Sequence, residues 1–65
     1  MRTLLERTYK APDGSKRVAL VTAPNSFQVR LFVSGEKGET VMDTLIPAHT
    51  WYRHRQMYVD QFSGR

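Results

Sequence analysis

Five consecutive residues, Trp51 to Arg55, combine two aromatic rings, two guanidinium groups and an imidazole. Guanidinium groups pair with phosphates and aromatic rings stack on bases, so this combination is typical of proteins that hold single-stranded nucleic acid. Other cations of the chain could extend the same surface. The candidate nucleic-acid-binding residues are Lys16, Arg17, Arg30, Tyr52, Arg53 and Arg55.

The spacing of the other reactive residue types does not favour catalysis or metal binding. His49 and His54 are five residues apart, which on a helix separates them by about 140° and keeps them from one ion. The chain has no cysteine. Its serines fall in predicted turns or in the tail, and its glycines do not precede a helix as a phosphate-binding loop requires. We therefore expect no metal site, no cofactor and no enzymatic activity.

The apolar pattern divides the chain into a sheet and a helix. Apolar residues recur about every second position over 2–46, and every third or fourth position over 47–62. Turn-forming residues interrupt the first part at 11–15, 23–26 and 35–38. The pattern predicts an α+β fold in a single domain, 1–65: a four-stranded antiparallel β-meander with one C-terminal amphipathic helix packed on the sheet. The expected strands cover about 2–10, 16–23, 27–34 and 39–46, and the expected helix covers 47–62.

The predicted helix begins at Pro47, a residue that suits the first helical position, and Gly64 is expected to stop it. Arg55 falls inside its apolar arc. Either the stem of Arg55 covers the edge of the core while its head reaches water or a neighbouring ring, or Arg55 forms a binding site with those rings. The apolar residues of the arc are Ala48, Trp51, Tyr52, Tyr58, Val59 and Phe62.

The second predicted strand is apolar on both faces, which is typical of a strand covered on both sides. We expect Trp51 and Phe62 to cover the sheet face that carries Val29 and Leu31. One helix covers one face only, and a chain this short, with no disulfide, buries only about 60% of its unfolded surface. We therefore expect a homodimer or another partner chain on the second face. Its predicted interface consists of Val21, Phe32 and Met42.

The net charge of +4 is unevenly distributed along the chain. Residues 1–23 carry five Lys and Arg against two Asp and Glu, and residues 47–65 carry three against one. Residues 24–46 carry two against three. The basic parts are therefore the first hairpin and the helix, as phosphate binding would require. A charge of this size is also within the range that solubility alone explains.

Four antiparallel strands followed by a helix resemble the single-stranded-DNA-binding transcriptional coactivators, which are dimers of such units. Leu45-Ile46-Pro47 followed by Trp51 resembles their strand-to-helix junction over about seven residues, with one more residue between proline and tryptophan. The resemblance implies nucleic-acid binding by a dimer. The alternative is a small phage- or plasmid-type protein that binds and inhibits or adapts a host protein. Exposed aromatics beside arginines would favour nucleic acid, and exposed aromatics beside Phe32 and Met42 would favour a protein.

The expected location is the cytoplasm, without membrane attachment. No segment near the N-terminus has the apolar run of a signal peptide, and no segment approaches the roughly 20 apolar residues of a membrane span. The absence of cysteine suits a reducing compartment.

Overall fold

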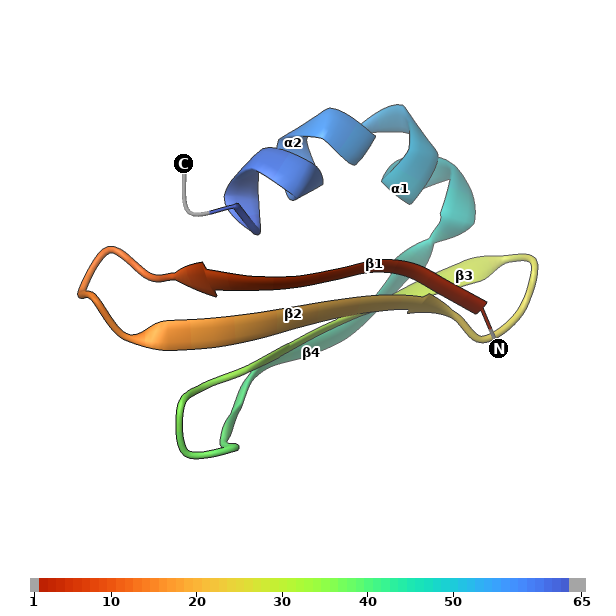
Figure 1. The fold of residues 1–65 in the computed structure, drawn as a ribbon. Coiled ribbons are helices and arrows are strands. Elements are labelled where there is room, and N and C mark those ends of the chain that lie inside the picture. The colour runs from red at the N-terminus through yellow and green to blue at the C-terminus, as the bar shows by residue number, and fades with distance from the viewer. Residues whose placement is uncertain (1, 64–65) are drawn as a thin grey trace.

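The computed structural model describes residues 2–63. Four antiparallel strands, β1 (Arg2–Lys10), β2 (Lys16–Ala23), β3 (Gln28–Ser34) and β4 (Thr40–Pro47), precede two short helices, α1 (Ala48–Arg53) and α2 (Arg55–Gln61). The strands lie in chain order, β1-β2-β3-β4, and both helices pack on one face of the sheet (Figure 1). The predicted α+β fold with an antiparallel meander is confirmed. β1 and β2 span the expected residues, whereas β3 and β4 each begin one residue later than expected.

Local turn chemistry closes the first and third hairpins. In the β1–β2 turn, Oδ1 of Asp13 accepts hydrogen bonds from the backbone N–H and the hydroxyl of Ser15, at 2.9 and 2.6 Å. Gly14 follows Asp13 with a φ of 90°, and Gly38 ends the β3–β4 turn with a φ of 81°. Glycine adopts this left-handed conformation without the steric penalty that a Cβ atom brings. The two turns therefore follow from residues that the sequence places at the hairpin tips.

The hydrophobic core lies between the sheet and the two helices. Across β2 and β3, Val21 is opposite Leu31 and Ala19 is opposite Val33, so all four side chains share the face that the helices cover. Trp51 and Phe62 of the helical segment are buried among these side chains. This confirms the expected packing of the two rings against the face of β3. The buried cluster consists of Ala19, Val21, Val29, Leu31, Val33, Trp51 and Phe62.

The helical segment differs from the prediction of one continuous helix. The chain leaves helical geometry at His54, with φ −114° and ψ 25°, and α2 begins at the next residue. Phe62 follows the last residue of α2 and is buried in the core. The centroid of its ring lies 6.4 Å from that of Tyr9 on β1. Pro47 has an extended ψ of 144° and closes β4, so it precedes α1 instead of opening it. The expected stop at Gly64 lies outside the described residues.

The prediction that Val21, Phe32 and Met42 form one interface is wrong, because the three side chains do not share a face of the sheet. Val21 is fully buried under the helices, and Met42 packs against the same core. Phe32 is opposite Leu20 in the β2–β3 register, on the face that no helix covers among residues 2–63. The error arises because neighbouring residues of a strand point to opposite faces, and the register decides which of them meet. We call this second surface the open face.

Candidate nucleic-acid interface

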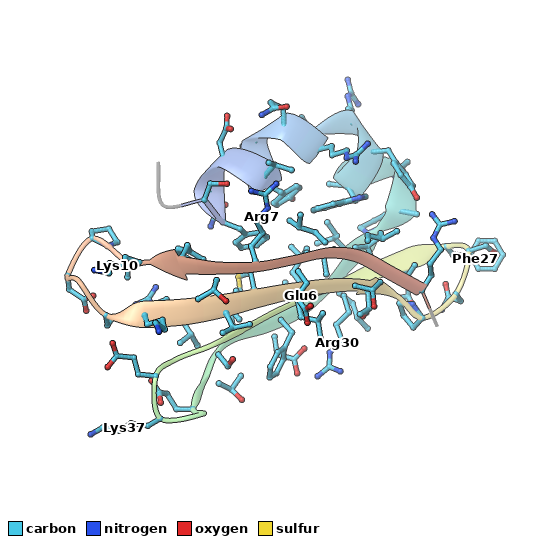
Figure 2. All side chains as sticks on the ribbon, viewed as in Figure 1. Glu6, Arg7, Lys10, Phe27, Arg30 and Lys37 are labelled. Carbon is cyan, nitrogen blue, oxygen red and sulfur yellow. The ribbon has the colours of Figure 1, made fainter. Side chains whose placement is uncertain are left out.

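Arginines of the first hairpin gather on the helix side of the sheet. Arg2 is opposite Ala23, Arg7 is opposite Ala19, and Arg17 is opposite Tyr9. Residues directly opposite each other share a face, so the buried position of Ala19 places Arg7 on the helix side. Figure 2 shows Arg7 pointing from β1 toward the helical layer, whereas Arg30 points away on the other side of the sheet.

The helical layer adds a second group of cations and an exposed ring. Arg53 ends α1 and Arg55 begins α2, and both side chains are exposed. Tyr52 is 53% exposed, and its hydroxyl accepts a hydrogen bond of 3.2 Å from Nη2 of Arg2. The exposed ring of Tyr52 therefore lies beside an arginine.

We define the arginine surface as Arg2, Arg7, Arg17, Arg53 and Arg55. Only one acidic residue of the described elements, Asp60 of α2, lies on the same side of the sheet. Asp60 accepts a hydrogen bond of 2.9 Å from the amide of Gln56. Asp13 of the β1–β2 turn lies near Arg17: hydrogen bonds from Ser15, and to a smaller extent the charge of Arg17, hold the pKa of Asp13 below its ordinary value. Five cations against these two carboxylates create a positive potential over this side of the fold, which attracts polyanions.

Arg30 lies on the open face and forms an ion pair with an acidic residue. Its Nε and Nη2 donate to the two carboxylate oxygens of Asp43 at 2.8 and 2.7 Å. The hydrogen bond from Arg30 holds the pKa of Asp43 below its ordinary value of 3.8. The guanidinium carbon of Arg30 also lies 5.1 Å from the ring centroid of Phe32. A phosphate at Arg30 would have to displace a bidentate carboxylate, so Arg30 is a poor phosphate ligand.

Lys16 is also separated from the arginine surface. It begins β2 opposite Lys10, and by strand alternation both side chains belong to the open face. Its backbone N–H donates to Oε1 of Glu36 at 2.7 Å, so the β3–β4 turn lies next to this end of β2. The predicted set is thus divided: Arg17, Tyr52, Arg53 and Arg55 lie on the helix side, and Lys16 and Arg30 lie on the open face.

Sequence reasoning missed Arg2 and Arg7. The signal for Arg7 was present, because it alternates with Leu5 and Tyr9 on one face of β1. No simple alternation assigns Arg2, because the register shifts between Thr3 and Leu5 and places an extra residue between them. A bulge of this kind exchanges the faces of all residues before it.

In comparisons with protein-family models, with curated proteins and with solved structures, nothing matched this chain. The resemblance to the single-stranded-DNA-binding coactivators therefore rests on the order of the elements and on the junction before Trp51. Neither helix of the described residues is long and apolar enough to cross a membrane. Within 2–63, no three His, Asp or Glu side chains gather as a metal centre would need, and the absence of a metal or cofactor stays a prediction.

Proposed function

We propose that this protein binds single-stranded nucleic acid along the arginine surface, without catalysis. The observation that carries the proposal is the one-sided distribution of charge: five arginines on the helix side against Asp60 and, near Arg17, Asp13 of the β1–β2 turn. On the open face the cations Lys10, Lys16 and Arg30 share their surface with Glu6 and Asp43. Phosphate neutralisation supplies most of the affinity of non-specific nucleic-acid binding, so the charged side is the favoured one.

The dimensions of the arginine surface suit a short single strand. Arg2 and Tyr9 are seven residues apart on β1, which corresponds to roughly 23 Å of strand, and Arg17 lies opposite Tyr9. A span of this length accommodates several nucleotides, within the range of other single-strand binding surfaces. The exposed ring of Tyr52 supplies a stacking platform at the Arg2 end. Helices of six and seven residues are only about 10 Å long, so they are poorly suited to reading a major groove.

The test compares the loss of one charge on each side of the sheet. Arg7→Gln and Lys16→Gln each remove one cation from an exposed strand position. With a fluorescently labelled single strand, we expect Arg7→Gln to weaken binding of all sequences alike. Its plot of log K against log salt should be shallower by about 0.7. Lys16→Gln should leave that slope close to the parent value. Equal effects of the two substitutions would show that total charge, and not the arginine surface, determines binding.

A second candidate function, binding of a protein, is favoured by the open face. Val18, Val41 and Leu45 are exposed, and Leu20 and Phe32 are half-buried beside them. Covering such apolar side chains with a second chain would remove them from water. The charges of this face nearly balance, so two copies of the chain can approach through it, whereas the arginine surfaces of two copies repel each other. A homodimer over the open face leaves the arginine surface free. A cytoplasmic location stays a prediction.

A further inference from the structure

A hollow of about 500 Å³ lies at the end of the sheet where the β2–β3 loop meets the start of α1. Its volume falls within the range of small-molecule pockets. Pro24 and Ala48 contribute apolar surface to its lining, whereas the side chain of Val29 is buried. The long polar side chains that line it are Arg2, Asn25, Gln28 and Tyr52, and Ser26 adds a hydroxyl. None of the described lining residues is acidic.

The loop that forms one wall is held in place by its own hydrogen bonds. Oδ1 of Asn25 accepts from the backbone N–H groups of Phe27 and Gln28, at 2.8 and 2.9 Å. The backbone N–H of Ala48 donates to the carbonyl of Phe27 at 2.8 Å, which ties the loop to the chain after β4. The wall is therefore organised before any ligand binds, so ordering it costs a ligand little.

These hydrogen bonds determine which polar groups remain for a ligand. Because Oδ1 of Asn25 is fixed on two N–H groups, its Nδ2 is the atom that donates to Oε1 of Gln28, at 3.2 Å. The amide of Gln28 thus keeps its N–H groups for another partner. The hydroxyl of Tyr52 accepts from Arg2 and keeps its own proton to donate. Arg2 retains further N–H donors.

The free groups of Arg2, Gln28 and Tyr52 are therefore all donors, and one of them carries a positive charge. Such a set binds an anion with several acceptor oxygens better than a neutral or cationic ligand. A phosphate monoester has these oxygens. The remaining volume and the apolar lining suit the sugar and base that a nucleotide attaches to its phosphate.

We infer that this hollow binds the phosphate monoester of a single nucleotide, either free or at the end of a nucleic-acid strand. The phosphate lies against Arg2, Tyr52 and Gln28, and the nucleoside lies over Pro24 and Ala48. For the end of a strand, the inference rests on the proposed function, because the hollow shares Arg2 and Tyr52 with one end of the arginine surface. For a free nucleotide it stands independently.

The experiment compares 12-nucleotide single strands that carry a phosphate at the 5′ end, at the 3′ end or at neither. We expect one of the phosphorylated strands to bind about tenfold more tightly than the hydroxyl-ended strand. Free AMP should bind, and adenosine should bind more weakly. Tyr52→Phe removes one donor and should reduce the preference for the terminal phosphate. Gln28→Glu replaces the donors by a carboxylate that can still accept from Asn25, and it should abolish the preference.

Gln61→Glu is the matched control, since it makes the same change at an exposed position of α2 and should lower the affinity for all strands equally. Equal binding of phosphorylated and hydroxyl-ended strands, together with no binding of AMP, would overturn the inference and leave the proposed function intact. Binding of AMP that Gln28→Glu abolishes, without binding of any strand, would support the hollow and refute the proposed function. A preference that survives both Tyr52→Phe and Gln28→Glu would also overturn the inference.

Discussion

Replacement of Trp51 by alanine is expected to remove most of the stability of this fold. Trp51 is 2% exposed, belongs to the buried cluster and stacks on Tyr58 with ring centroids 5.4 Å apart. An aromatic side chain buries about 150–250 Å², which at roughly 25 cal/mol per Å² corresponds to about 4–6 kcal/mol. Measured losses for such truncations are about 3–5 kcal/mol. A chain of 65 residues has a free energy of unfolding of roughly 3–10 kcal/mol.

The assay is thermal unfolding followed by far-ultraviolet circular dichroism, because the substitution removes the only tryptophan. A loss of about 3–5 kcal/mol lowers the Tm of a domain this small by at least about 12 °C. Tyr52→Ala is the control, since it removes a neighbouring ring that is about half exposed and should shift the Tm much less. If Trp51→Ala melted within a few degrees of the parent, Trp51 would not anchor the core and the packing described above would be incorrect.

Three further predictions concern the turns, the ion pair and the open face. Gly14→Ala should lower the free energy of unfolding by about 1–2 kcal/mol in urea titrations, because alanine is strained at a φ of 90°; a neutral effect would contradict the turn geometry. Arg30 lowers the pKa of Asp43, so their pair stabilises the fold above the ordinary value of 3.8. This contribution is lost as the pH falls through the lowered pKa, and urea midpoints of Asp43→Asn should fall less on acidification than those of the parent. Phe32→Ser should remain folded and sediment as a monomer where the parent self-associates, and a parent that is monomeric at high micromolar concentration would count against the homodimer.

Local chemistry made the hairpins predictable from the sequence. Asp13 and Gly14 specify their turn by themselves, and the alternation of β3 identified the face of Val29 and Leu31 that enters the core. The face of β2 was not predictable in the same way, because both of its faces are apolar and only the pairing of Val21 with Leu31 assigns them. For this reason the predicted interface combined Val21 and Phe32, which lie on opposite faces of the sheet.

The break between the helices has no sequence signal, since neither proline nor glycine occurs between Ala48 and Gln61. The face of the sheet on which Arg2 lies depends on the bulge after Thr3. The hollow beside Arg2 is formed by three segments that only the fold brings together. The composition of the candidate surface could therefore be read from the residue types. Its division between two faces required the strand register.

Binding of a single strand at two salt concentrations shows whether the arginine surface holds nucleic acid. The parent protein and Arg53→Gln are titrated into a labelled 12-nucleotide strand at low and at near-physiological salt. We expect the parent to bind with a Kd below about 100 μM at low salt, and a slope of about −0.7 for each phosphate neutralised. Arg53→Gln should make this slope shallower by about 0.7, because it removes one phosphate contact. No binding below about 100 μM at low salt would show that the arginine surface does not bind nucleic acid, because electrostatic attraction alone should give a higher affinity on such a surface.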